Sequence, residues 1–211
     1  MGRTSRPQLS PVPPITTALI VANVAMFFLE QVAPGSIDAF ALWPLGAAGA
    51  GGPSFAPWQL VTYAFLHGGM LHLAFNMFAL YMFGGAIEQV FGTRRYLTYY
   101  FVCVVSAALT QLVFAAMSGG FYPTVGASGG VFGLLLAYGI YFPNNRVMLI
   151  FPPIPMPARV FVLVYAAIEL FLGVTGTQEG VAHFAHLGGM IGGFALLRYW
   201  RGPGGGRRVI R

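Results

Sequence analysis

Residues 125–142 read VGASGGVFGLLLAYGIYF, a run of eighteen residues without a charged side chain. A helix that crosses the hydrocarbon core of a bilayer needs about 17 to 25 mostly apolar residues, so this run is long enough. Five further runs of the same kind lie on either side of it. The six predicted spans are residues 15–32, 70–87, 96–117, 125–142, 158–174 and 181–200. The pattern predicts an all-α membrane protein with six transmembrane helices.

The composition supports a membrane protein. Hydrophobic residues make up 57% of the 211 residues and charged residues only 8%, whereas charged residues are about a quarter of a soluble domain. The predicted organisation is a tail over residues 1–14, one helical domain over residues 15–200 with a long loop at 33–66, and a flexible basic tail over 201–211. Lipid is therefore the expected solvent of most of the chain.

The charged residues predict an orientation. Every basic residue is an Arg, and all eleven fall in segments on one side of the predicted bundle: Arg3, Arg6, Arg94, Arg95, Arg146, Arg159, Arg198, Arg201, Arg207, Arg208 and Arg211. Loops that carry Arg stay in the cytoplasm, so both termini are expected there. The membrane orientation thus accounts for the excess of Arg and the net charge of +6, and we expect no nucleic-acid partner.

Polar side chains within the spans are costly in hydrocarbon and deserve individual attention. His72 and Asn76 are four residues apart on one helical face, and His183 and His186 are three apart on another. Ser128 opens the span quoted above. Because all three spans start on the external side, these side chains are expected to lie at similar depth, nearer the outside.

Ser128 and His186 form a possible nucleophile and base. A lone Ser in a membrane helix is more often a packing residue, but the glycines around Ser128, including Gly126, leave its hydroxyl and nearby N–H groups uncovered. Gly129 and Gly133 can pack against Gly189 and Gly193, since small residues allow helices to approach closely. This packing favours His186 over His183 as the base, because His186 lies one turn before Gly189. No acidic residue is evident beside it, so the expected unit is a dyad.

His72 and Asn76 are expected to donate hydrogen bonds to an oxyanion. The alternative, that they only hold helices together, is the commoner role for either residue alone. His183 is expected to support the site.

Three motifs resemble those of the rhomboid family of intramembrane serine proteases. Gly126-Ala127-Ser128-Gly129 is similar to the nucleophile motif, Ala185-His186-Leu187-Gly188-Gly189 to the histidine motif, and His72-Leu73-Ala74-Phe75-Asn76 to the oxyanion pair. The resemblance extends over residues 15–200. It implies a rhomboid-like bundle that uses Ser128 and His186 to cut single-pass membrane proteins in or near their transmembrane segment.

The resemblance also implies no cofactor or metal, and a place in the lipid bilayer as a multi-pass protein, in the inner (plasma) membrane if the source is bacterial. His67 and Glu88 match structural residues of the family. Two positions depart from it. Gln59 follows Trp58 where the family often has Arg, and Phe132 stands where it often has Tyr.

Two alternatives remain open from the sequence. The chain could be a rhomboid-like pseudoprotease that binds membrane clients, although such proteins characteristically lack the Ser or the His. It could also be a metalloenzyme built on His67, His72, His183 and His186. The sequence assigns no role to Glu169.

Overall fold

A computed structural model describes residues 13–33, 35, 38–148, 153–176 and 182–202. The predicted tails therefore lie almost wholly outside the described residues, as does the loop at 177–181. Among the described residues, three helical regions are long and apolar enough to cross a membrane: Pro14–Val32, Met70–Ser118 and Ala158–Thr175. Ser128–Tyr141 is a shorter apolar helix. These helices make the chain a membrane protein, while the count of six spans remains a prediction.

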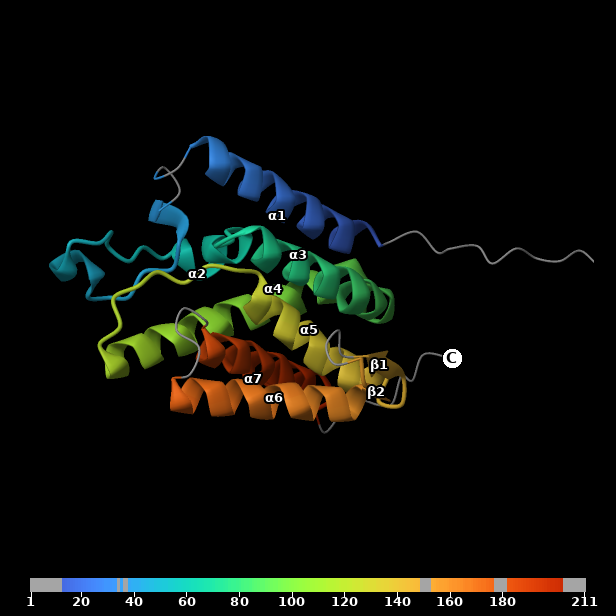
Figure 1. The fold of residues 1–211 in the computed structure, drawn as a ribbon. Helices are drawn as coiled ribbons and strands as arrows, with labels where there is room; N and C mark the ends of the chain where they lie inside the picture. The colour runs from blue at the N-terminus through green and yellow to red at the C-terminus, as the bar shows by residue number, and fades with distance from the viewer. Residues whose placement is uncertain (1–12, 34, 36–37, 149–152, 177–181, 203–211) are drawn as a thin grey trace, which may run out of the picture.

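The helices follow the predicted spans closely. The first is α1 (Pro14–Val32), and the region of the second and third spans contains α3 (Met70–Ala79), a π-helical turn η4 (Leu80–Gly84) and α4 (Gly85–Ser118). Then come α5 (Ser128–Tyr141), α6 (Ala158–Thr175) and α7 (His183–Trp200). Gly92, with φ of +69°, breaks α4 and lets the chain double back. Thus one long helical region contains two antiparallel segments (Figure 1).

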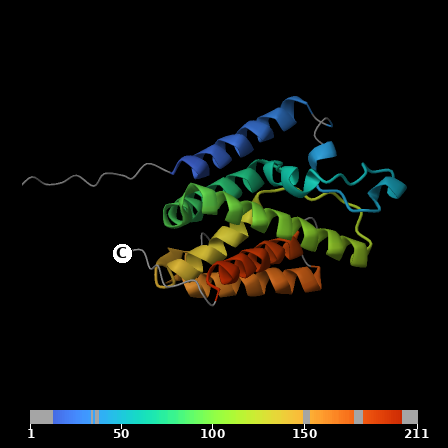
Figure 2. The same cartoon turned by 180° about the vertical axis from the view of Figure 1, so that it is seen from behind.

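All three helices that carry the predicted site begin toward the same end of the bundle. Figure 1 shows α3, α5 and α7 starting at the left of the view, where α1, α4 and α6 end. The start of α1 and the end of α7 lie toward the opposite end. From behind, α4 and α7 run side by side (Figure 2), and Ser106 on α4 donates a 2.8 Å hydrogen bond to the carbonyl of Gly188 on α7.

One small segment between the predicted spans is not helical. Two short strands, β1 (Arg146–Met148) and β2 (Pro155–Pro157), pair antiparallel between α5 and α6. Prolines disfavour helix here because they lack an N–H and clash with the preceding turn. The segment forms a small ribbon at the end of the bundle away from loop 33–66 (Figure 1).

Loop 33–66 contains η1 (Asp38–Phe40), η2 (Ala47–Ala50), α2 (Gln59–Thr62) and η3 (Tyr63–Phe65). Gln59 anchors it although it is not an Arg. Its buried amide accepts a 3.1 Å bond from the N–H of Trp43 and donates a 3.0 Å bond to the carbonyl of Ala39. Gln59 thus supplies polar anchoring to the loop at a position where the family often has Arg.

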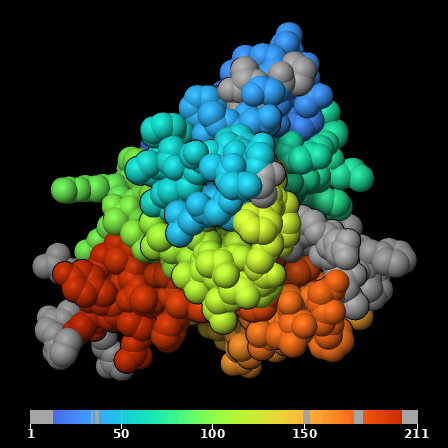
Figure 3. All heavy atoms as spheres, turned by 90° about the vertical axis from the view of Figure 1, so that its left-hand side faces the viewer, coloured from blue at the N-terminus to red at the C-terminus, as the bar shows by residue number. Residues whose placement is uncertain are grey.

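The loop also reaches the segment that leads to Ser128. Leu42 and Thr124 exchange two backbone hydrogen bonds of 3.0 and 2.9 Å. In Figure 3, which views this end of the molecule, the loop lies directly against the segment after α4. The start of α5 is thereby held in place.

Glu88 links the first helix to the rest of the bundle. Its buried carboxylate accepts bonds from the N–H groups of Ile15 (3.0 Å) and Thr16 (2.7 Å), and from the Thr16 hydroxyl (2.7 Å). These N–H groups belong to the first turn of α1. They have no hydrogen-bond partner within the helix, and the start of a helix favours a negative charge. Glu88 therefore has the structural position that the resemblance implied.

Candidate active site

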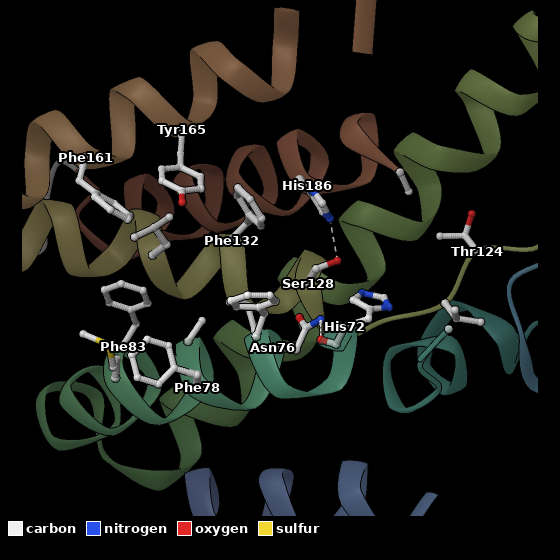
Figure 4. A pocket seen from close by; sticks show the side chains of 18 of the residues that line it. His72, Asn76, Phe78, Phe83, Thr124, Ser128, Phe132, Phe161, Tyr165 and His186 are labelled. Carbon is white, nitrogen blue, oxygen red and sulfur yellow. Dashed lines mark hydrogen bonds between the residues drawn. The ribbon is translucent and has the colours of Figure 1, made fainter. Parts of the chain in front are cut away.

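Ser128 and His186 meet at the centre of the site. Ser128 is the first residue of α5, and His186 lies in the first turn of α7. The Ser128 hydroxyl lies 2.7 Å from His186 Nε2, within hydrogen-bond range (Figure 4). His186 is buried, with 8% of its surface exposed, so water competes little for this contact. A Ser–His pair in this geometry can transfer the hydroxyl proton to the imidazole.

Close glycine packing brings the two helices together. A Cβ on Gly189 would collide with the backbone carbonyl of Gly129, and a Cβ on Gly133 would lie 3.3 Å from the carbonyl of Gly189. Gly193 differs from expectation because it faces Tyr99 and Cys103 of α4, not α5. The α5–α7 contact is therefore centred on Gly129, Gly133 and Gly189.

His72 and Asn76, both on α3, lie beside Ser128 (Figure 4). Gly126 makes room for His72: a Cβ there would lie 2.8 Å from His72 Cε1, and its φ of +129° disfavours any other residue. The buried Asn76 amide donates a 2.9 Å bond to the carbonyl of His72. An amide nitrogen carries two hydrogens, so one N–H of Asn76 is left for a further acceptor.

Phe132 covers one face of the base. Its ring is stacked on that of His186, with centroids 4.3 Å apart and an angle of 6° between the planes. The aromatic face expected at this position is therefore kept, without a hydroxyl.

Glu169 is a site residue that the sequence did not assign. It lies on α6, is 8% exposed, and its Oε2 is 2.9 Å from His186 Nδ1 and 2.7 Å from His183 Nδ1. The expectation that no acidic residue accompanies the base was wrong. The sequence signal was the charge itself, since a carboxylate in an apolar span needs a partner.

The four histidines do not form one cluster of metal ligands. His67 packs against His72, with centroids 5.1 Å apart, whereas His183 and His186 share Glu169. Among the residues that the structure describes, the one group of three candidate ligand side chains is Glu169, His183 and His186. His67 and His72 are therefore not placed to join it.

A pocket of about 640 Å³ extends from Ser128 between α3 and α6. Its walls are mostly apolar, and Figure 4 shows aromatic rings from both sides pointing into it. The side chains that line its length include Phe78, Phe83, Phe132, Phe161 and Tyr165. A pocket with this lining is suited to apolar groups of a ligand.

Comparison with known proteins agrees with this arrangement. A family model described as the Rhomboid domain matches residues 54–202, well over half of the chain. The chain belongs to the rhomboid family. The matched region of this rhomboid chain includes Ser128, His186, His72, Asn76 and Glu169.

Several curated proteins are similar to this rhomboid chain. The Rhomboid protease GluP of Bacillus subtilis is 31% identical over 86% of the chain and 34% of its own length. The Rhomboid protease GlpG of Pectobacterium atrosepticum is 27% identical over 89% of the chain and 62% of its own length. RHOMBOID-like protein 4 of Arabidopsis thaliana is 33% identical over 66% of the chain and 33% of its own length. The chain thus spans between a third and two thirds of these relatives.

Proposed function

We propose that this protein is an intramembrane serine endopeptidase that cuts single-pass membrane proteins in or near their transmembrane segment. The contact of 2.7 Å between Ser128 Oγ and His186 Nε2 carries the proposal. It joins residues that are 58 positions apart in the sequence. Ser128 stands at the start of α5, where glycines leave room for a substrate carbonyl. The names of the similar proteases GluP and GlpG support the same activity.

The chemistry follows from the pair. As the Ser128 oxygen attacks the scissile carbonyl carbon, its proton passes to His186 Nε2 and the carbonyl oxygen becomes an oxyanion. The carbon–nitrogen bond then breaks, and the leaving nitrogen takes the proton from His186. A water molecule, deprotonated by the same imidazole, hydrolyses the ester and regenerates the Ser128 hydroxyl.

His72, Asn76 and the backbone N–H of Ser128 are the proposed oxyanion donors. The first-turn N–H groups of α5 have no partner within the helix, so that of Ser128 remains available to donate to the oxyanion. In other proteases a single donor of this kind contributes about 2.7 to 4 kcal/mol to stabilising the transition state.

The pocket suggests how a substrate reaches the pair. It is bordered by Phe78 and Phe83 on one side and by Phe161 and Tyr165 of α6 on the other. We therefore propose that α6 is the gate for a substrate segment from the bilayer. Since helical carbonyls are hydrogen-bonded, the substrate must unwind, which favours Gly, Pro or polar residues near the outer end of its helix and small residues at the cut.

The proposed orientation has both termini in the cytoplasm and Ser128 near the external face. The position of every Arg supports it. In a bacterium the membrane would be the inner (plasma) membrane, and water would enter from the outside.

Reconstitution tests the proposal. The wild type, Ser128→Ala and His186→Ala are placed in liposomes with a single-pass model substrate, and Ser118→Ala, at the exposed end of α4, serves as the matched serine control. We expect cleavage by the wild type and Ser118→Ala only, together with labelling of Ser128 by a fluorophosphonate.

Each alternative has its own outcome. Substrate binding without any cleavage by the wild type would support a pseudoprotease. Loss of cleavage on adding a chelator, with no sensitivity to serine reagents, would support a metalloenzyme.

A further inference from the structure

A buried carboxylate on α6 contacts the proposed base at the ring nitrogen that does not face Ser128. Glu169 Oε2 accepts from two imidazoles, at 2.7 Å from His183 Nδ1 and 2.9 Å from His186 Nδ1. Glu169 is 8% exposed, and the other residues of α6 from 166 to 174 are apolar, so an unpaired charge there is costly. Its two partners come from a different helix, so it joins α6 to α7 at the site.

The carboxylate determines which nitrogen of His186 carries the proton. An ionised carboxylate only accepts hydrogen bonds, so the His186 nitrogen facing it must be Nδ1–H. The lone pair of a neutral imidazole is then on Nε2, 2.7 Å from the Ser128 hydroxyl. This order of acid, imidazole and hydroxyl is the one found in serine protease triads.

His183 holds the carboxylate in place. It is 5% exposed, and its Nδ1 shares Glu169 Oε2 with His186 at a centroid separation of 6.3 Å. A second donor from the same helix restricts rotation of the Glu169 side chain. His183 therefore acts on His186 through Glu169.

Hydrogen bonds explain these distances better than a shared metal ion. Two ligands of one tetrahedral zinc, each bonded at about 2.0 to 2.1 Å, lie about 3.3 Å apart. The separations here are 2.7 and 2.9 Å, which match charge-assisted hydrogen bonds.

We propose that Glu169 is a positioning residue that holds His186 in the Nδ1–H tautomer and stabilises the imidazolium formed when Ser128 attacks, making the site a Ser128–His186–Glu169 triad clamped by His183. The proposal rests on the proposed protease function. It also means that the helix bordering the pocket contributes to the catalytic unit. A displacement of α6 thus changes both access to Ser128 and orientation of its base.

Glu169→Gln tests the triad. A neutral amide stabilises the imidazolium far less than a carboxylate does, and where its NH₂ group faces His186 it favours the wrong tautomer. We expect kcat for substrate cleavage and the rate of fluorophosphonate labelling to fall by on the order of 100-fold or more, with KM changed less than about twofold. Glu169→Asp, which keeps the charge with a shorter reach, should recover part of the loss.

Glu88→Gln is the matched control, because Glu88 is also buried and bridges two helices, at the start of α1, which lies toward the end of the bundle opposite to the starts of α5 and α7 (Figure 1). We expect a lower melting temperature but an unchanged kcat per folded molecule. Labelling of Glu169→Gln at the wild-type rate would overturn the triad, whereas failure of the wild type to label would overturn the protease function instead.

A measurement on the wild type covers the case in which the Glu169 variants do not fold. Nitrogen-15 NMR of wild type with labelled histidine identifies the protonated nitrogen of each ring, with His186→Ala used to assign the signal. We expect Nδ1–H for His186 and a proton signal shifted far downfield by the carboxylate. An Nε2–H tautomer would overturn the proposal whether or not the protein cleaves.

Discussion

The Asn76 side chain shows how one residue can serve both structure and chemistry. Its amide donates to the carbonyl of His72, four residues earlier, and Asn23 on α1 donates in the same way to the carbonyl of Leu19 at 2.7 Å. Both are buried, but only Asn76 lines the pocket at Ser128. The two asparagines thus form a matched pair for a test.

Asn76→Ala is expected to lower kcat about 100- to 1,000-fold with little change in KM, because it removes a proposed donor to the oxyanion but no contact to the bound substrate. Asn23→Ala should leave kcat per folded molecule unchanged. Steady-state kinetics in liposomes measures both. Equal losses in the two variants would show that the amide acts through helix packing alone.

His67 gives the fold a dependence on pH. Burial, together with a smaller repulsion from His72, lowers the pKa of His67 from the ordinary value of 6.5 to about 4. The unfolded chain therefore binds a proton at higher pH than the fold does. The stability associated with neutral His67 is fully present above about pH 6.5 and is lost as the pH falls toward 4, by roughly 3 kcal/mol in total.

His67→Leu removes this titration while keeping an apolar side chain at the position. We expect the melting temperature of the wild type to fall more steeply than that of His67→Leu between pH 7.5 and pH 4.5, measured in detergent by thermal unfolding. Carboxylates titrate in both proteins, so the difference between the two curves isolates His67. Parallel curves would contradict the buried, neutral state of this ring.

The residues of the site differed in how far the sequence could predict them. Ser128, His186, His72 and Asn76 fall in short motifs, and depth could be estimated from the alternation of helices. Glu169 could not be assigned because its contacts to His183 and His186 depend on how α6 is rotated against α7. Spacing along a chain predicts which residues share a helical face, but not which neighbouring helix that face meets.

At the scale of elements, the positions of the helices followed from apolar length. The first predicted span, 15–32, corresponds to α1 (Pro14–Val32), and the fifth, 158–174, to α6 (Ala158–Thr175). The irregular features were not predicted. The π-helical turn at Leu80–Gly84 ends at a close contact between elements, where a Cβ on Gly84 would lie 2.6 Å from the Tyr96 hydroxyl. Hydropathy carries no signal for such a contact.

The contact of α5 with α7 predicts a sensitive position. In Gly189→Ala the new methyl group would meet the carbonyl of Gly129, which is rigid backbone, so the helices must separate. His186 lies one turn before Gly189, and the separation would lengthen its bond to Ser128. We expect a loss of about 1 to 3 kcal/mol in stability and at least a tenfold fall in kcat.

Gly49→Ala is the control for this substitution, since a Cβ at Gly49 would meet nothing within 4 Å. Its melting temperature and kcat should equal those of the wild type. If Gly189→Ala also keeps both values, the close approach of α5 and α7 does not hold the site together.

At the scale of the whole molecule, the mechanism depends on which end of the bundle faces outward. Loop 33–66 lies at the end where α3, α5 and α7 begin, and the ribbon of β1 and β2 lies at the other (Figure 1). Arg146 in that ribbon and Arg159 directly after it favour the cytoplasm for this end. Water and the cut in the substrate would then both be on the external side.

Labelling of single cysteines tests this orientation. The one native cysteine, Cys103, is fully buried, so it gives little background. We expect a membrane-impermeant maleimide to label Gly49→Cys in intact cells or spheroplasts, and Asn144→Cys, at the exposed turn after α5, only after permeabilisation. The reverse pattern would place Ser128 near the cytoplasm. Because the reacting carbonyl must lie at the depth of Ser128, it would also move the expected cut to the inner end of the substrate helix.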